Sequence, residues 1–275
     1  YNAQVICEQA KEAAEHGAKI IVFPELCITG YTCNDLFLQE LLLEKAKEAL
    51  LTIAEETGQL ETLFLVGLPV DKDGRLYNVA AVLYRGRILG MIPKKNIPMY
   101  AEFYEGRHFT PGEETVTEYR LGKQVIPFGS NLLFRCEELP ELILGCELCE
   151  DLWVAEPPST SHALMGATVI ANLSASNETV SKDDYRTLLI KASSARLLCG
   201  YIYTSAGEGE STQDLVFGGH DLIAENGTLL VQSARFTTGI LYTDLDVLKI
   251  SSERRRMGTF GKRPMKPYLC LLYTS

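Results

Sequence analysis

Apolar residues recur along the chain with two spacings, one typical of helices and one typical of strands. Residues 4–15 carry apolar positions at helical spacing and end before Gly17, a suitable C-terminal cap. A longer helix is predicted to follow Asp35 and to stop at Gly58. A further helix is predicted to start at a capping box formed by Ser181 and Asp184, and to end at Gly200. The apolar face of the second helix, expected to lie in the core, comprises Leu41, Leu42, Ala46, Ala49, Leu50 and Ile53.

Short apolar runs between these helices predict strands. A strand that begins at Leu142 leads toward a turn, and Asn226-Gly227 is a typical hairpin turn. The other expected strands cover residues 20–23, 63–70, 76–84, 87–92, 168–173, 201–206, 218–223 and 228–232. Helices and strands that alternate in this way predict an α/β fold.

Composition limits the classes of partner. The 275 residues are 46% hydrophobic, which suffices for one large domain with its own core. A net charge of −10 argues against nucleic acid or an anionic membrane as a general partner. No apolar run approaches the ~20 residues that span a bilayer. Eight cysteines in a chain this long without a secretory signal predict reduced thiols and a cytoplasmic location.

Cys149 is the first candidate for chemistry. It lies in the run LILGCELCEDLWV, which reads as a buried strand that ends in a sharp turn. A nucleophile needs such a place, because a rigid strand holds it while one side stays open. The alternative is a buried structural cysteine.

Two charged residues also follow predicted strands. Glu25 comes after the strand at 20–23 and Pro24, and Lys94 comes directly after Pro93. Open α/β sheets commonly place catalytic groups at strand ends. Together with Cys149 they supply a carboxylate, an ammonium and a thiol. The lysine would favour a thiolate at Cys149, whereas burial and Glu25 would oppose it, and the sequence leaves the balance open.

The pair Cys146 and Cys149 also raises the possibility of a metal or redox site. A structural zinc site needs a second pair of ligands at matching spacing, and the four histidines are scattered. A thioredoxin-like motif should open a helix, but Pro157 and Pro158 follow too closely. We therefore expect no metal site and no cofactor in this chain.

Several motifs resemble the carbon–nitrogen hydrolase (nitrilase) superfamily, whose sites use a Glu–Lys–Cys triad. More narrowly, the chain resembles the glutaminase domain of glutamine-dependent NAD synthetases. The motifs that carry this resemblance extend from about residue 20 to 261 and are FPELCITGYTCNDLF, PKKNIPMYAEFYEGRHFTPG, CEDLWV, ANLSASN, AGEGESTQDLVFGGHDLIAENG and ERRRMGTF.

The resemblance implies a four-layer αββα sandwich and a site for glutamine. Family members begin with a strand that is missing before the first helix here. Residues 1–252 would form the hydrolase domain, and residues 253–275 would start a linker toward a synthetase domain that this chain lacks, where ATP and Mg would bind. The family also implies a homo-oligomer. The final stretch LCLLYTS has no match in the family pattern.

The resemblance also assigns site residues. Glu25, Lys94 and Cys149 would be catalytic, Glu105 would orient the first two, and the backbone N–H of Glu150 would stabilise an oxyanion. The substrate contacts that the resemblance implies are Tyr100, Trp153, Ser176 and Lys182, the last at a position where the family usually has arginine.

Three alternatives to this function remain. The chain could be a stand-alone amidase or carbamoylase of the same superfamily. It could be a non-catalytic scaffold, which retention of all three triad residues argues against. It could also be a metal- or redox-binding module that uses Cys146 and Cys149.

Overall fold

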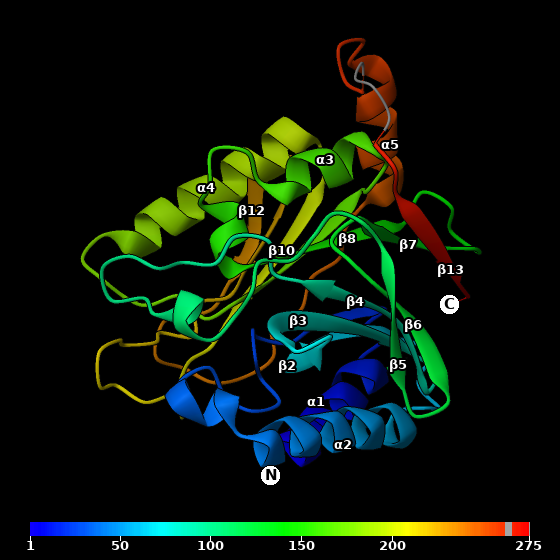
Figure 1. Cartoon of the computed structure of the whole chain (residues 1–275). Helices are drawn as coiled ribbons and strands as arrows, with labels where there is room; N and C mark the ends of the chain where they lie inside the picture. Colours follow the sequence, from blue (N-terminus) through cyan, green and yellow to red (C-terminus); the bar gives the residue numbers. More distant parts are fainter. Residues whose placement is uncertain (262–265, 275) are drawn as a thin grey trace.

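Two packed β-sheets form the centre of the molecule. The computed structural model describes residues 1–261 and 266–274, and in this part of the chain the strands form one sheet of six and one of seven (Figure 1). The first sheet has the spatial order β1 (Ile20–Val22), β2 (Leu63–Lys72), β3 (Arg75–Tyr84), β4 (Arg87–Pro93), β6 (Gln124–Phe128) and β5 (Thr117–Leu121). The second has the order β12 (Thr228–Gln232), β11 (Leu222–Glu225), β10 (Gly200–Ser205), β9 (Val169–Ser174), β8 (Ile143–Leu148), β7 (Leu132–Cys136) and β13 (Leu269–Tyr273).

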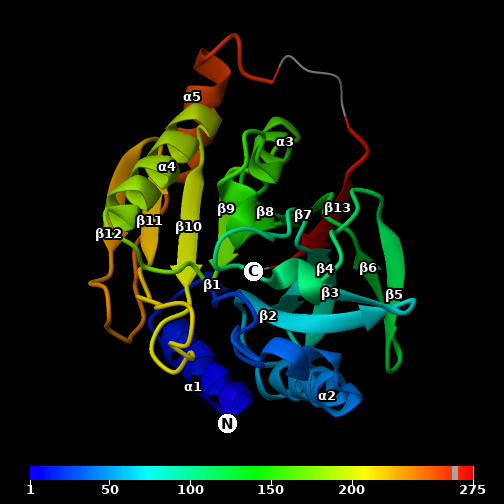
Figure 2. The same cartoon turned by 60° about the vertical axis from the view of Figure 1, so that its left-hand side comes forward.

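Helices cover the outer faces of both sheets. In Figures 1 and 2, α1 and α2 lie below the six-stranded sheet, and α3 and α4 lie against the seven-stranded one. The α-helices are α1 (Asn2–Glu15), α2 (Glu40–Glu56), α3 (Pro158–Leu164), α4 (Lys182–Leu197) and α5 (Val247–Arg256). Short 3-10 helices are η1 (Asn34–Leu38), η2 (Glu105–Arg107) and η3 (Cys149–Leu152). This order of layers confirms the four-layer αββα sandwich.

Alternation along the strands explains the layers. In β2, Leu63 and Leu65 belong to the cluster between the two sheets, whereas Phe64 and Val66 pack with the helices outside. Successive side chains of a strand point to opposite faces, so both faces of this strand are buried. That is why its sequence reads as a continuous apolar run.

Three details of the sequence prediction are wrong. Leu41 is 64% exposed, because at about 3.6 residues per turn it lies on nearly the opposite side of α2 from the buried Ala46 and Leu50. Ser181 has a φ of 63° and makes no capping hydrogen bond, since a capping side chain needs an extended backbone. The strand expected at 218–223 is β11 at Leu222–Glu225, because Gly219 takes a φ of 59° that no strand adopts.

The first and the last strand of the chain lie at the edges of their sheets. β1 is the outer strand of the six-stranded sheet, and β13 pairs in parallel with β7. Helix α5 continues across the expected domain boundary after residue 252. Residues 262–265 and 275, which belong to the predicted linker, lie outside the described part of the chain. No helix among the described residues has the length and apolarity needed to cross a bilayer.

Candidate active site

The three residues that the sequence places at strand ends come together where the sheets meet. Glu25 follows β1, Lys94 follows β4 and Cys149 follows β8. The backbone N–H of Glu25 donates to the carbonyl of Ser174, at the end of β9 in the other sheet, over 3.2 Å. The turn at Glu25 packs directly on Gly67 of β2, where a Cβ would lie 2.2 Å from the backbone nitrogen of Leu26. Glycine at position 67 is therefore required for Glu25 to reach the site.

A fully buried ion cluster surrounds Lys94. Its Nζ donates to Glu25 Oε1 over 2.7 Å and to the two oxygens of Glu105 over 2.7 and 2.9 Å. Burial alone would lower the pKa of Lys94, but the charges of Glu105 and Glu25 hold this pKa well above its usual value. The lysine therefore stays protonated. It binds Glu25 and Glu105 at the same time, so the structure places Glu105 in one cluster with Glu25 and Lys94.

Two further polar side chains that the sequence prediction missed complete this cluster. Asn78, on β3, donates to Glu25 Oε1 over 2.7 Å, and the hydroxyl of Tyr31 donates to Glu105 over 2.8 Å. Asn78 is fully buried inside the otherwise apolar run YNVAAVLY, and a lone polar residue in such a run was the available signal. Tyr31 offered no comparable signal.

Cys149 has the backbone of a constrained turn. Its φ is 40°, in the left-handed region that residues other than glycine rarely adopt, and η3 begins at this residue. Burial, followed by the charge of Glu25, raises the pKa of the Cys149 thiol to about 12, although Lys94 acts in the opposite direction. The balance that the sequence left open thus falls on the side of the neutral thiol.

Glu25 is suited to take a proton from a neighbouring group. Burial raises its pKa to about 7, against the effect of Lys94. Its Oε1 accepts from Lys94 and Asn78, whereas its buried Oε2 has no hydrogen-bond partner among the described residues. A carboxylate with one oxygen free and a pKa near neutrality can serve as a general base.

Asp151 connects the loop after Lys94 to the turn at Cys149. Its Oδ1 accepts from the backbone and side-chain nitrogens of Asn96 over 2.8 and 2.7 Å, and its Oδ2 accepts from the backbone N–H of Leu148 over 3.0 Å. Asp151 was not among the predicted site residues, because its partner is 55 residues away in the sequence.

One cavity collects the predicted substrate contacts. It has a volume of about 520 Å³, within the usual range for small-molecule sites, and Cys149 lies in its wall. Tyr100, Glu150, Trp153, Ser176 and Lys182 all line it, together with Phe103, which the sequence prediction missed. The structure thus brings every predicted substrate contact to the same place as the thiol.

The charged side chains that line this cavity are the cation Lys182 and the acids Glu102 and Glu150. Lys182 Nζ lies 5.1 Å from the centre of the Trp153 ring and donates to the side-chain oxygen of Asn177. The hydroxyl of Tyr100 lies 3.0 Å from both carboxylate oxygens of Glu150. Burial lowers the pKa of Lys182 and raises the pKa of the Glu150 side chain. A small molecule with both charges would meet complementary partners.

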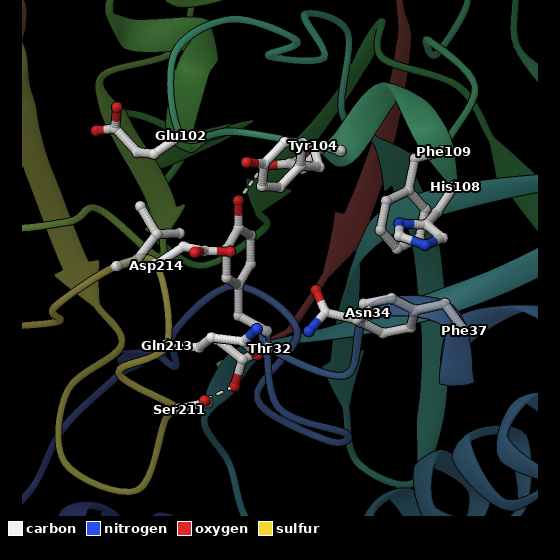
Figure 3. A pocket seen from close by; sticks show the side chains of 13 residues that line it. Thr32, Asn34, Phe37, Glu102, Tyr104, His108, Phe109, Ser211, Gln213 and Asp214 are labelled. Atoms are coloured by element: carbon white, nitrogen blue, oxygen red, sulfur yellow. Dashed lines mark hydrogen bonds between the residues drawn. The ribbon is translucent and has the colours of Figure 1, made fainter.

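A second cavity, drawn in Figure 3, has Glu105 among its lining residues. It measures about 60 Å³ and lies among η1, η2 and the loop that carries Ser211 and Gln213. Figure 3 shows Asn34 and Thr32 on one side of it, and Glu102, which also lines the first cavity, on another. Glu105 of the buried ion cluster therefore faces a cavity other than the one that Cys149 lines.

The two thiols of the Cys-x-x-Cys pair face different surroundings. Cys146 is packed between the sheets with Leu144 and Leu148, whereas Cys149 lines the cavity. Among residues 1–261 and 266–274, no three histidine, cysteine or acidic side chains are grouped as a metal would require. Nothing in this arrangement favours joint chemistry of the pair.

Comparisons with known proteins agree with this geometry. A curated relative from Mycobacterium tuberculosis, named glutamine-dependent NAD(+) synthetase, is 44% identical over 94% of this chain and 38% of its own length. A relative of the same name from Thermotoga maritima is 32% identical over 96% of this chain and 43% of its own length. A solved glutamine-dependent NAD(+) synthetase from Cytophaga hutchinsonii has a TM-score of 0.76 at 30% identity, covering 85% of this chain and 38% of its own. An amidase from Nesterenkonia sp. AN1, at 21% identity and a TM-score of 0.70, shares the fold over 93% of this chain and 90% of its own. The chain spans about two fifths of the length of the curated relatives it matches. The family model described as carbon–nitrogen hydrolase matches residues 1–255, and the chain belongs to this family.

Proposed function

We propose that this chain is a glutaminase, which hydrolyses the side-chain amide of glutamine to glutamate and ammonia. The observation that carries the proposal is the buried Lys94, held between Glu25 and Glu105 and acting electrostatically on Cys149, which lines the same cavity as Lys182. The names of the synthetase relatives support glutamine as the substrate.

The reaction starts from the neutral thiol. Glu25 takes the proton of Cys149 as the sulfur attacks the amide carbon, and the C–N bond of the resulting tetrahedral adduct then breaks. Lys94 and the backbone N–H of Glu150, in the first turn of η3, stabilise the negative oxygen of this adduct. Glu25 gives its proton to the leaving nitrogen, so that ammonia departs and a thioester remains.

Water completes the cycle. Glu25 is again a carboxylate after ammonia leaves, and it removes a proton from a water that attacks the thioester carbon. The second adduct collapses by breaking the C–S bond, and the proton on Glu25 returns to the sulfur. Glutamate and the free Cys149 thiol result, and Glu105 keeps Lys94 in place throughout.

The α-carbon groups of glutamine have candidate partners at the same cavity. The ammonium of Lys182 suits the α-carboxylate, and the carboxylate of Glu150 suits the α-ammonium. Tyr100, Trp153 and Ser176 would pack around the aliphatic part and the amide. A simple amide without these charges should bind more weakly.

The wider role is a step in NAD synthesis. Residues 1–252 would supply ammonia, and residues 253–275 would lead toward a synthetase domain of the same polypeptide, where ATP and Mg support amidation of the deamido precursor. The full-length protein would be a homo-oligomer. The 38–43% coverage of the synthetase relatives supports this division.

An assay of glutamate release from glutamine tests the function. The purified chain should release glutamate, and Cys149→Ala should abolish the release together with labelling by a glutamine-like electrophile. Cys146→Ala is the matched control and should keep substantial activity, because its side chain is packed between the sheets. Equal loss from both changes in folded proteins would favour a dithiol mechanism instead.

A further inference from the structure

Arg186 is the largest fully buried side chain of the described residues, and it does not line the cavity. It lies on α4, one turn after Lys182, with its guanidinium beneath the segment that follows β9. Its Nη2 donates to the hydroxyl of Ser176 over 3.2 Å and to the carbonyl of Asn177 over 3.1 Å. Its Nη1 donates to Glu178 over 2.8 Å. One guanidinium therefore contacts three consecutive residues.

The surroundings of Arg186 are built to hold a buried charge. Removing a guanidinium from water is costly unless a partner compensates it, and Glu178 supplies the opposite charge. Gly218 leaves the room for this carboxylate, since a Cβ there would lie 2.6 Å from Glu178 Oε1. His220 Nδ1 lies 3.0 Å from Arg186 Nη1 and must accept, because a guanidinium only donates. Burial and the charge of Arg186 accordingly lower the pKa of His220.

The segment that Arg186 holds is also part of the cavity. Ser176 lines it directly. The side chain of Asn177 accepts from Lys182 and donates to Glu102, two charged residues that line the same cavity. The position of the Lys182 ammonium thus depends on Asn177, and the position of the Asn177 backbone depends on Arg186.

We infer that Arg186 is a positioning residue for substrate recognition: by holding Ser176 and Asn177 from below, it sets the place of Lys182 and the shape of the cavity wall. This inference rests on the proposed glutaminase function. Lysine at this position would keep the positive charge but lose the planar fork that serves several acceptors at once.

The test is Arg186→Lys in the whole chain, with glutamine as substrate. One or two charge-assisted hydrogen bonds would be lost, so the KM for glutamine should rise roughly 10- to 100-fold, with a much smaller change in kcat. Alkylation of Cys149 by iodoacetamide, a small electrophile without α-carbon charges, should keep its wild-type rate. Arg196→Lys, at an exposed position of the same helix, is the control and should change neither quantity.

The outcomes separate the possibilities. An unchanged KM in folded Arg186→Lys overturns the inference, and so does an equal slowing of alkylation and turnover, which would mark a purely structural role. If this variant does not fold, Glu178→Gln carries the same test, because it removes the partner charge while keeping the shape. An unchanged KM in that variant also overturns the inference. A wild-type chain that releases no glutamate would refute the proposed function itself.

Discussion

Replacing Lys94 with methionine should separate its electrostatic role from its packing. Methionine fills a similar volume but removes the charge that faces Glu25 and Glu105, both of them buried. Breaking a buried ion cluster by removing one partner costs about 3–5 kcal/mol, and protonation of a remaining carboxylate reduces this cost. Loss of one oxyanion donor should lower kcat about 10²- to 10³-fold.

The same variant should shift the pH dependence of the rate in a defined direction. Glu25 acts in its ionised form, so the rate should rise with pH through the Glu25 pKa of about 7. Lys94 lowers that pKa, whereas burial and the charge of Glu105 raise it. Without Lys94 the hydrogen bond from Asn78 still lowers the pKa of Glu25, but burial and the charge of Glu105 outweigh it more strongly, so the acid limb of the profile should move to higher pH.

The assay is glutamate release from pH 5 to 9, with unfolding by urea measured on the same proteins. Lys95→Met is the matched control, since Lys95 pairs with Glu114 at a partly exposed position and should have little effect on either quantity. An acid limb that stays in place or moves to lower pH in Lys94→Met would refute this account of Glu25. A larger loss from Lys95→Met would show that the two lysines are assigned the wrong way round.

Further predictions concern the substrate site, the core and the scope of the activity. In steady-state kinetics, Lys182→Arg should lower the KM for glutamine, and Lys182→Ala should raise it with a smaller effect on kcat. An unchanged KM in Lys182→Ala would show that the residue is only a surface charge. Asp151→Asn should lower kcat at least several-fold, because an amide NH2 group replaces one of the two carboxylate oxygens that accept from Asn96 and Leu148. Normal turnover in this variant would exclude a role of Asp151 in holding the turn at Cys149. Burial raises the pKa of Glu147 from 4.5 to about 7, so its protonated form stabilises the fold below pH 4.5 and that contribution is lost as pH rises through 7. At about 1.4 kcal/mol per pH unit, the free energy of unfolding measured with urea should fall by about 3 kcal/mol between pH 4.5 and 7 in the wild-type chain. This fall should be absent in Glu147→Gln and present in the control Glu118→Gln, whose position is exposed. The chain alone should make no NAD from glutamine, ATP and the deamido precursor, and detection of that product by chromatography would contradict the proposed division of domains.

The sequence alone was enough to locate the candidate catalytic groups along the chain. Glu25, Lys94 and Cys149 each follow an apolar run at the point where a strand ends, and this is a local pattern. The fold class was accessible for the same reason, because helical and strand periodicities are set by neighbouring residues. The resemblance to carbon–nitrogen hydrolases added Glu105 and the substrate contacts.

Local patterns failed where packing or backbone conformation decided. Leu41 begins the apolar run of α2 but lies on the side of the helix away from the buried Ala46 and Leu50, so its side chain remains exposed. Ser181 has the residue type of a cap, but its left-handed backbone prevents the capping contact. The spacing of residues does not reveal the backbone conformation of Ser181.

The tertiary structure decided how the reactive groups are held and what charge they carry. Asn78 contacts Glu25 across 53 positions of sequence, and Asp151 contacts Asn96 across 55. The first contact exists only after β1, β2 and β3 have paired in one sheet, and the second only after the two sheets have packed face to face. That packing also removes water from the cluster. The absence of water is what raises the pKa values of Glu25 and Cys149, so the protonation states of the site are a property of the fold and not of any segment of the sequence.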